Sequence, residues 1–392
     1  MIAGTLPPVD VAIVGGGIVG CACAWMAGAA GLRVALFEAQ RIGAGATAAG
    51  MGHLVVIDED PAELALARLS MALWPRWDGW RAIERTTTGT LWIAETEAQA
   101  RAAQAKRARL AQAGWPAEWL DAAALRAAEP RLAHDLAGAL HVANDEVAYG
   151  PGMAARLAAD ARACGARVEE MAPVERIEDS GVLLRDGRRV AAAHVLLAAG
   201  CDSVRLWRGP APLALRPRKG QLAITDRYPG WIRHALVELG YVDSAHGQEA
   251  ESVAFNAQPR ASGQVLLGSS RRFDDASPAV DAALLARMVR RAQRFLPAIG
   301  ELQLLRSWAG FRPATPDGRP LVGRVPDTRG PAIQWVASGH EGLGLTTAMG
   351  TARLWLDLLL GRPCAIDPAP YAPGRTSAAP SAAAAQPAEA AS

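Results

Sequence analysis

The feature that most constrains the fold is the run from Asp10 to Glu38, DVAIVGGGIVGCACAWMAGAAGLRVALFE. An apolar segment over residues 11–14 leads into a cluster of glycines, a stretch of small residues and a second apolar segment over residues 33–37. Short apolar runs bounded by glycine are typical of buried strands, and the small residues between them suit a closely packed helix. The order strand, glycine turn, helix, strand is that of a βαβ unit, so the sequence predicts an α/β fold with parallel strands.

The glycine cluster, GGGIVG over residues 15–20, has the spacing G-x-G-x-x-G together with the flanking strand and helix of a dinucleotide-binding turn. Gly15 permits the tight turn, Gly17 lets the backbone approach a pyrophosphate, and Gly20 lets the helix and strand pack closely. The helix that follows offers free N–H groups and the positive end of its dipole to the phosphates. Glu38 ends the second strand, where an acid accepts hydrogen bonds from a ribose.

A membrane segment is the alternative interpretation of this run, because residues 11–32 carry no charge and are long enough to cross a bilayer. The glycines and the continuation into a strand pattern argue against it. A signal peptide is also disfavoured, since Asp10 rather than a lysine or arginine precedes the apolar stretch. We therefore expect no transmembrane segment and a cytoplasmic protein, with a peripheral position at the inner membrane left open.

The composition excludes several classes of protein. The 392 residues are 51% hydrophobic and 20% charged with a net charge of +2, which indicates a globular chain with no affinity for nucleic acid. The five cysteines are scattered and include no C-x-x-C pair, so we expect no metal site and a reducing compartment. Cys21 and Cys23 lie in the first predicted helix, where small residues are needed for packing.

Helices and strands are predicted to alternate along the rest of the chain. Helical patterns occur at residues 62–83, 97–113, 121–129, 151–165, 281–295 and 346–360. Strand patterns occur at residues 86–93, 167–177, 181–190, 195–199, 221–225, 252–256, 264–268, 302–309 and 334–338. Trp74, Trp77 and Trp80 recur at a spacing of three, and such a stripe belongs to a core.

Nucleotide-binding patterns at both ends of the chain predict a discontinuous domain. We expect an α/β (α+β mixed) fold in which a Rossmann-like domain spans residues 9–54, 145–215 and 310–372. A mixed-sheet substrate domain is expected to be inserted over residues 55–144 and 216–309. Residues 373–392 are rich in alanine, proline and serine and are predicted to be a disordered tail.

Three further glycine-rich segments favour a flavin over a nicotinamide dinucleotide. Residues 43–52 form a loop of small side chains that can lie against a flat ring. Residues 195–200 form a strand that ends in a small turn beside the pyrophosphate. Residues 338–344 lead a glycine turn into a helix, whose N-terminus can stabilise negative charge on a reduced flavin. No second G-x-G-x-x-G is present for NADPH, which disfavours a reductase or an NADPH-dependent monooxygenase.

These segments together resemble the D-amino-acid oxidase superfamily of FAD enzymes over residues 9–373. The resemblance is carried by GGGIVG (15–20), GAGATAAGM (43–51), VLLAAG (195–200), PRKGQL (217–222), QPRASGQVLLGSS (258–270), WAGFRPATPDGRPLVG (308–323) and SGHEGLG (338–344). GAGATAAGM is most similar to the glycine oxidase branch. GMGHLVV with FNAQPRASGQVLLGSSR is more similar to D-hydroxyproline dehydrogenase and opine oxidase subunits. The resemblance implies a Rossmann-like FAD domain with a mixed-sheet substrate domain.

The flavin site is predicted to draw on all of these segments. Its predicted FAD-binding residues are Gly15, Gly17, Ile18, Val19, Gly20, Glu38, Ala39, Ala46, Thr47, Ala48, Gly50, Met51, Gly52, Val174, Ala199, Gly200, Gly310, Gly339, His340, Gly342, Leu343, Gly344, Leu345 and Thr346. In the sarcosine oxidase branch a cysteine before T-P-D attaches the flavin covalently. The matching position here is Gly310, so the resemblance implies non-covalent FAD.

Three residues are candidates for catalytic roles: Arg312, His53 and His340. The resemblance implies that Arg312 binds the substrate carboxylate, and a guanidinium can do so bidentately. A structural Arg312 paired with Asp317 is the alternative. His53 follows the small-residue loop and is expected to contact substrate or flavin, to act as a base, or to be structural. For His340, packing or hydrogen bonding is as well supported as catalysis.

Six other residues are secondary candidates for the substrate pocket. Arg218 and Lys219 are predicted to face either the ring or solvent, and Phe255 and Gln258 are weaker candidates on the inserted sheet. Glu238 and Asp243 are the acids that a cationic substrate would need.

The sequence therefore predicts an FAD-dependent oxidoreductase acting on a C–N bond. The α-hydrogen of a small amino or imino acid passes as hydride to flavin N5 and gives an imine, for which the protein supplies orientation rather than acid–base groups. D-Proline, D-hydroxyproline or another D-amino acid is the leading expectation. A glycine or sarcosine oxidase, or the FAD subunit of a multi-subunit amino-acid or opine dehydrogenase, is the alternative. Oxygen, a quinone or a partner subunit remain open as electron acceptors, as do homo- and hetero-oligomeric states.

Overall fold

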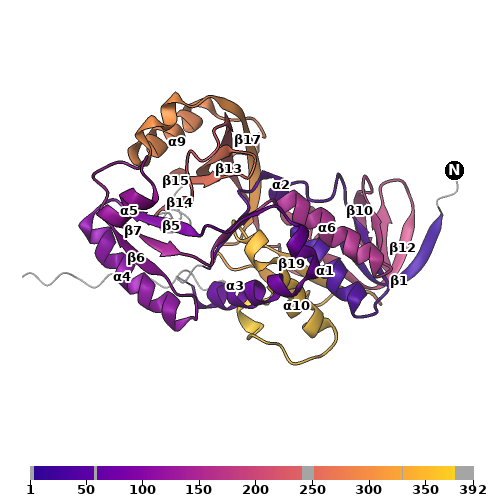
Figure 1. Cartoon of the computed structure of the whole chain (residues 1–392). Coiled ribbons are helices and arrows are strands. Elements are labelled where there is room, and N and C mark those ends of the chain that lie inside the picture. Colours follow the sequence, from indigo (N-terminus) through magenta and orange to yellow (C-terminus); the bar gives the residue numbers. More distant parts are fainter. Residues whose placement is uncertain (1–3, 57–59, 241–250, 329, 376–392) are drawn as a thin grey trace, which may run out of the picture.

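The computed structural model describes residues 4–56, 60–240, 251–328 and 330–375. Two eight-stranded sheets form the body of the molecule, and helices cover both (Figure 1). Asp243 and the part of the predicted tail beyond residue 375 lie outside the described residues. Within the described residues, no helix has the length and apolarity needed to cross a membrane.

The first sheet contains the βαβ unit that the sequence predicts. Its parallel part runs, in order across the sheet, through β9 (Arg167–Glu169), β2 (Val34–Phe37), β1 (Thr5–Val14), β12 (Arg189–Leu197) and β19 (Ile333–Ser338). The antiparallel additions are β10 (Val174–Glu178), β11 (Gly181–Leu184) and β18 (Leu321–Arg324). The predicted strand over residues 167–177 is thus two strands, because Met171 turns the chain with a φ of 53°.

Helices of small and apolar residues pack together beside this sheet. They are α1 (Ile18–Ala29), α3 (Pro61–Leu73), α6 (Gly150–Ala163) and α10 (Gly344–Leu359). Figure 1 shows α1 and α6 next to β1 and β12. Cys21 and Cys23 are free and buried in α1, as expected for packing residues. This arrangement confirms the predicted Rossmann-like element and places the start of α1 at the carboxyl end of β1.

The predicted helix over residues 62–83 is shorter than its pattern indicates. It ends at Leu73, because Pro75 has no backbone N–H to continue the hydrogen bonds of the helix. Two 3₁₀ turns follow, η1 (Trp74–Arg76) and η2 (Asp78–Ala82). The three tryptophans lie in and between these turns and are buried, so the prediction of a core stripe is confirmed although the helix is not.

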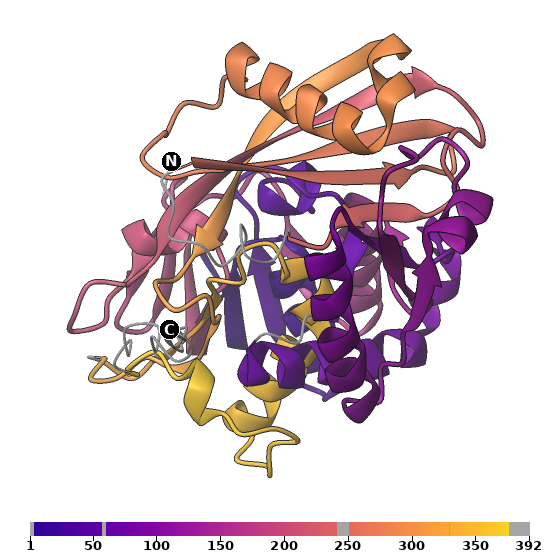
Figure 2. The ribbon, with the colours of Figure 1, turned by 90° about the vertical axis from the view of Figure 1, so that its left-hand side faces the viewer.

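The second sheet is mixed. In order across it lie β17 (Leu304–Ala314), β13 (Arg216–Arg227), β16 (Gln264–Arg272), β15 (Glu251–Pro259), β14 (Ala235–Glu238), β5 (Thr90–Ala94), β7 (Gly138–Val142) and β6 (Glu118–Asp121). The helices α4 (Glu97–Gln112), α5 (Ala122–Ala128) and α9 (Ala282–Phe295) pack against it. Figure 2 shows α9 lying across the outer face of the long strands. Only the pair β14 and β5 is parallel among the described pairs of this sheet.

A small third sheet joins these parts through β3 (His53–Leu54), β8 (Glu146–Ala148) and β4 (Arg85–Thr86). The predicted strand over residues 86–93 is therefore wrong as one element, because the chain leaves β4, turns at Gly89 and enters β5 of another sheet. Gly89 has a φ of 76°, which side chains rarely adopt. The remaining short helices are α2 (Ala46–Ala49), α7 (Ser203–Leu206), η3 (Gly200–Asp202), η4 (Pro297–Glu301) and η5 (Ala369–Tyr371).

One face of the second sheet packs against the core beneath α9, and the other face lines a cavity. Along β13 the side chains alternate, so Ala223 packs in the core beneath α9 while Leu222 faces a cavity on the opposite side. The predicted domain boundary at residue 310 falls inside β17, which pairs with β13 along most of its length, from Leu304 to Ala314. The division of the chain into two domains stays a prediction.

Phe255 lies on the α9 face of β15, so its prediction as a pocket residue is wrong. Its ring stacks on Phe295 of α9 with centroids 4.4 Å apart. We expect Phe255→Ala to lower the free energy of unfolding by about 3–5 kcal/mol, the usual cost of truncating a buried phenylalanine. The KM for the amine that the sequence predicts as substrate should stay within about threefold of the native value, because the cavity wall is untouched.

Urea unfolding and steady-state kinetics of the protein loaded with the predicted FAD measure both quantities. Leu305→Ala is the matched control, since Leu305 is 63% exposed on β17 and its truncation should be almost neutral. A large change in KM without a loss of stability would contradict this assignment of Phe255.

Candidate active site

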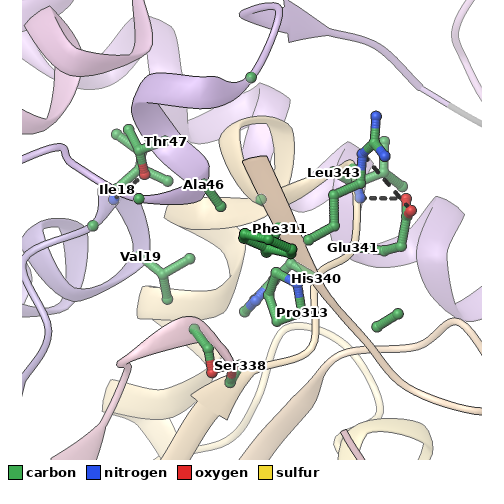
Figure 3. Close-up of a pocket in the computed structure, with 18 of the residues that line it drawn as sticks. Ile18, Val19, Ala46, Thr47, Phe311, Pro313, Ser338, His340, Glu341 and Leu343 are labelled. Atoms are coloured by element: carbon green, nitrogen blue, oxygen red, sulfur yellow. Dashed lines mark hydrogen bonds and ion pairs between the residues drawn. The ribbon is translucent and has the colours of Figure 1, made fainter. Parts of the chain in front are cut away.

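One cavity of about 1620 Å³ extends from the glycine turn after β1 to the inner face of the second sheet. This volume exceeds the roughly 300–1,000 Å³ of a typical small-ligand pocket, so the cavity has room for a dinucleotide and a substrate together. In Figure 3 the side chains of Phe311, His340 and Glu341 lie together, across the cavity from Ile18 and Thr47.

The glycine turn has the geometry that a pyrophosphate needs. Gly15 has a φ of 110°, and a Cβ there would lie 2.5 Å from the carbonyl oxygen of Ala198. A Cβ on Gly20 would lie 2.0 Å from the carbonyl oxygen of Gly15, so any side chain would push α1 away from the strand. Gly17 precedes α1 without a side-chain cap, and nothing but the Thr47 hydroxyl approaches its missing Cβ. The N-terminus of α1 therefore opens into the cavity and suits an anion.

Glu38 lies beside this turn, where the sequence predicts a ribose-binding acid. One carboxylate oxygen accepts a hydrogen bond of 2.6 Å from the Gly16 amide, and the other accepts one of 2.8 Å from the Gln40 amide. Glu38, Ala39 and Gln40 all line the cavity. The carboxylate is thus fixed at the mouth of the turn, in a position to accept hydrogen bonds from ribose hydroxyls.

The middle of the cavity is lined by a second helix N-terminus and by small residues. α10 begins at Gly344 without a capping side chain, and Gly342, Leu343 and Leu345 line the cavity beside it. On the opposite side, a Cβ on Gly310 would lie 2.2 Å from the Cβ of Ala49. This close approach of β17 to the loop around α2 leaves no space for a cysteine at position 310. A flat ring with a polar, electron-accepting edge fits between these walls, as FAD requires.

All but four of the predicted FAD-binding residues line the cavity. Gly20, Ala48, Gly339 and Thr346 do not. Gly20 serves the packing of helix on strand that the sequence predicts for it. Thr346 lies behind the wall, where its hydroxyl accepts a hydrogen bond from the Val55 amide. Gly339 has a φ of 83° and turns the chain from β19 toward α10. As a set of ligand contacts, the residues remain a prediction.

The two histidines are neutral polar groups in the cavity wall. His53 Nε2 is hydrogen-bonded to Thr90 at 2.8 Å, and His340 Nε2 to Thr351 at 2.9 Å. Burial lowers the pKa of His53 to about 3 and that of His340 to about 4. Such weak bases stay unprotonated at neutral pH, so the geometry favours hydrogen bonding over general-base catalysis for both.

Arg312 is held in the cavity wall by its neighbours on the sheet. Its Nη1 donates a hydrogen bond of 3.1 Å to the carbonyl oxygen of Ser270, and the guanidinium lies on the backbone of Gly220. A Cβ on Gly220 would lie 2.3 Å from Nη1. The alternative pairing of Arg312 with Asp317 is wrong, because both Asp317 oxygens accept hydrogen bonds from Arg375 at 2.8 Å. Arg312 therefore remains directed at the cavity.

Two further arginines and one acid complete this part of the wall: Arg218, a secondary candidate from the sequence, and Arg271 and Glu341, to which sequence reasoning gave no role. Glu341 Oε1 lies 3.7 Å from Arg218 Nη1, 3.8 Å from Arg312 Nε and 3.9 Å from Arg271 Nε. Burial opposes ionisation of Glu341, but the neighbouring guanidinium groups outweigh it and hold the pKa of this carboxyl below its usual range. The sequence signal that could have placed Arg218 in the cavity wall is the alternation of side chains along β13, which puts Arg218 on the same face as Gly220 and Leu222.

The other secondary candidates lie elsewhere. Lys219 is on the opposite face of β13, where its ammonium pairs with Asp275 at 2.8 Å. Glu238 accepts a hydrogen bond of 2.6 Å from Arg291 outside the cavity. Gln258 is buried away from the cavity, and Asn256 on the same strand lines it instead. Within the described residues, no cluster of metal-ligating side chains is found.

A buried acid stands behind His53. Asp145 accepts hydrogen bonds from Trp115 at 3.2 Å and from Trp92 at 3.5 Å, and the Thr90 hydroxyl donates to it as well. The Thr90 hydroxyl thus links the ring of His53 to the carboxyl group of Asp145. Burial raises the pKa of Asp145 to about 7. The chain Asp145–Thr90–His53 thus orients the ring at the cavity wall.

Comparison with known proteins gives a consistent result. Residues 10–358 match the family model described as DAO, FAD dependent oxidoreductase. The glycine oxidase of Geobacillus kaustophilus is 31% identical over 92% of this chain and 96% of its own length, and its crystal structure superposes with a TM-score of 0.84 over 95% of this chain and all of that one. The glycine oxidase of Pseudomonas aeruginosa is 30% identical over 93% of this chain and 98% of its own. A D-amino acid dehydrogenase of Paramagnetospirillum magneticum is 32% identical over only 59% of this chain and 53% of its own.

Ionisation of Asp145 should make stability depend on pH. Between about pH 4 and pH 7 the folded protein retains a proton that the unfolded chain has released, so the free energy of unfolding from this group falls as pH rises through that window. In Asp145→Asn this dependence is absent. We expect the Tm of the native protein, relative to that of the variant, to fall between pH 5 and pH 8.

Thermal unfolding of both proteins across this pH range measures the difference, and the contributions of His53 and His340 cancel in it. Asp186→Asn, a change at an exposed acid, should leave the native pH dependence almost intact. Parallel Tm curves for the native protein and Asp145→Asn would contradict the assignment.

We expect the FAD to be held without a covalent bond. No cysteine occurs among the described residues that line the cavity, and Ala49 occupies the space that a side chain at position 310 would need. Precipitation of the holoprotein with acid should therefore release all of the yellow flavin to the supernatant. Flavin that stays with the pellet after washing in denaturant would contradict this prediction.

Proposed function

The chain belongs to the DAO family of FAD-dependent oxidoreductases, and from this premise we propose that it oxidises the C–N bond of glycine or an N-substituted glycine. As a member of this family it is an FAD-dependent amino acid oxidase. The observation that carries the finer proposal is the placement of Arg312 in the cavity wall, near the start of α10 and the small-residue loop. A carboxylate on this guanidinium puts the α-carbon of a small amino acid within the ring-binding part of the cavity.

The comparisons favour the glycine-type alternative over D-proline or D-hydroxyproline. Two relatives matched along nearly the whole chain at 30–31% identity are glycine oxidases, whereas the D-amino acid dehydrogenase match is partial. The segment FNAQPRASGQ, which motivated the imino-acid expectation, forms the end of β15 and its turn toward β16. Of that segment only Asn256 lines the cavity, so most of it is remote from the substrate.

The chain's own residues bind and orient the substrate. Arg312 presents two N–H groups to the α-carboxylate in the planar arrangement that suits bidentate binding. Asn256 Oδ1 is a buried acceptor without a hydrogen-bond partner among the described residues, and it can accept from the substrate amine. Met51, Trp92 and Leu222 add apolar walls that exclude water from the reacting carbon.

The bound FAD supplies a two-electron acceptor for the α-hydrogen and its electron pair. His53 and His340 stay neutral, so the substrate must arrive as the free amine or lose its proton to solvent. The carbon–nitrogen double bond that results is hydrolysed by water. Such a reaction depends on position and charge rather than on a side-chain base, in keeping with the absence of a strong base among the described residues that line the cavity.

The test is a screen of amines against the FAD-loaded protein. We expect anaerobic bleaching of the flavin by glycine or sarcosine, and peroxide when the same mixtures are exposed to air. Bleaching without peroxide would support amine oxidation and indicate that the electrons pass to a quinone or a partner subunit rather than to oxygen. Bleaching by D-proline alone would overturn the glycine-type proposal, and bleaching by no amine would overturn amine oxidation by the isolated chain.

Arg312→Leu should raise the KM for glycine by about two orders of magnitude or more, because a charge-assisted bidentate contact is lost in a buried site. The flavin spectrum should remain that of the native holoprotein, since the leucine still packs against Gly220. Arg306→Leu, a change on the exposed part of the same strand, is the control. An unchanged KM in Arg312→Leu would rule out the carboxylate contact.

A further inference from the structure

We propose that Glu341 makes the cavity select amino acids over simple carboxylic acids. Its carboxylate lies beside Arg312, so it repels the carboxylate of any ligand that this guanidinium binds. A ligand that also carries an ammonium group brings a positive charge that offsets the repulsion. The inference rests on the proposed function for the role of Arg312, and it adds the residue that determines which acids bind there.

The side chain of Glu341 is held in place by the turn before α10. The Glu341 amide donates a hydrogen bond of 3.0 Å to the carbonyl oxygen of Pro313, the residue after Arg312. The Gly342 amide donates another to Oε2 of Glu341, and dashed lines in Figure 3 mark interactions of this carboxylate. Glu341 has a φ of 44°, a left-handed conformation that is uncommon for a residue with a side chain. The carboxylate is therefore fixed relative to the strand that carries Arg312.

The other carboxylate oxygen of Glu341 lies among guanidinium groups. This oxygen, Oε1, is 3.7–3.9 Å from nitrogen atoms of Arg218, Arg312 and Arg271. It is buried and makes no hydrogen bond among the described residues. Burial raises the pKa of Glu341, but the guanidinium groups outweigh this effect and hold the pKa below its usual range. Glu341 is therefore ionised at neutral pH, and its negative charge adjoins the group that binds the substrate carboxylate.

A ligand carboxylate on Arg312 shares the guanidinium with this negative charge. Its oxygens lie about 2.7–2.9 Å from the guanidinium nitrogens, so the two anions are only a few ångströms apart. Repulsion at such a distance changes a binding constant about tenfold or more, even in a partly screened site. An amino acid carries an ammonium group next to its carboxylate at neutral pH and has no net charge. Glu341 therefore opposes the binding of a simple acid more than that of an amino acid.

Arg312 does not need Glu341 to keep its position in the wall. Its Nη1 donates a hydrogen bond of 3.1 Å to the carbonyl oxygen of Ser270, and the guanidinium lies on the backbone of Gly220. A Glu341 that only held the arginines in place would strengthen the binding of every carboxylate. The structural and the selective role thus predict opposite effects on propionate binding when the charge of Glu341 is removed.

Binding is measured on the oxidised protein loaded with FAD, with propionate and glycine as a matched pair. The two ligands differ only in that propionate has a methyl group in place of the ammonium group. The change in flavin absorbance gives the Kd of propionate, and the binding of glycine is measured by its KM, or by absorbance if it is not oxidised. In Glu341→Gln we expect the Kd of propionate to fall about tenfold or more, while the value for glycine stays within about threefold.

Three further variants test the assignment. Glu341→Gly is a second neutral variant that suits a φ of 44°, and it should also bind propionate more tightly. Glu341→Asp keeps the charge and should keep most of the native selectivity. In Glu341→Gln combined with Arg312→Leu, the gain in propionate binding should disappear.

Glu118→Gln is the control, because it removes an equal charge from an exposed position on β6 and should leave both binding constants unchanged. Flavin content and the far-ultraviolet circular dichroism spectrum identify a variant that has not folded.

The outcomes separate this proposal from the proposed function. If the neutral variants bind propionate no more tightly than the native protein does, the selective role of Glu341 is overturned, and an equal gain for glycine overturns it too. Either result leaves the oxidation of glycine standing if glycine bleaches the flavin. A gain for propionate alone, with no bleaching by any amine, supports the role of Glu341 and overturns the proposed oxidation.

Discussion

The candidate site depends on the contact between Arg312 and Gly220 across two paired strands. The register of β13 and β17 puts the guanidinium directly on a backbone that has no side chain to displace it. Any larger residue at position 220 would occupy the position of the guanidinium. The same two strands carry Leu222 and Gly310 toward the cavity, and the opposite face of the sheet is covered by α9. One pairing register therefore sets the carboxylate-binding group, the space for the ring and the hydrophobic core at once.

The electrostatics of the cavity divide into two regions with different origins. At the dinucleotide end, positive potential comes from the backbone N–H groups at the start of α1, of which that of Ile18 donates to the Thr47 hydroxyl. At the substrate end it comes from arginine side chains around Glu341. The histidines between these regions are neutral, because burial lowers the pKa of each well below its usual value. The cavity therefore attracts anions at both ends. Its two histidines are too weakly basic to take a proton from the substrate at neutral pH.

The sequence predicted the parts of the fold that local patterns determine. The βαβ unit, the flavin loops and most helices follow from glycine spacing and periodicity, which depend on short-range geometry. The failures have equally local causes. The tryptophan pattern predicted a helix that continues past Pro75, but the helix ends at Leu73. The strand predicted over residues 86–93 is divided at Gly89 between two sheets. Phe255 was assigned to the pocket because nothing in a single strand tells which face will meet α9.

The arginines show why this site could be predicted only in part. The motif around Arg312 identifies this residue from the sequence. Arg271 and Glu341 are recognised as site residues only in the folded protein, where β16 and the turn before α10 come together beside β13. The residues that follow them in the sequence, Arg272 and Gly342, do not indicate that Arg271 and Glu341 lie close together. Arg218 lies directly opposite Arg312 on the paired strands, and like charges at such positions weaken the pairing unless an anion such as Glu341 lies beside them. The sequence of β13 alone shows neither Arg312 nor Glu341 beside Arg218, because both residues come from segments far away in the chain.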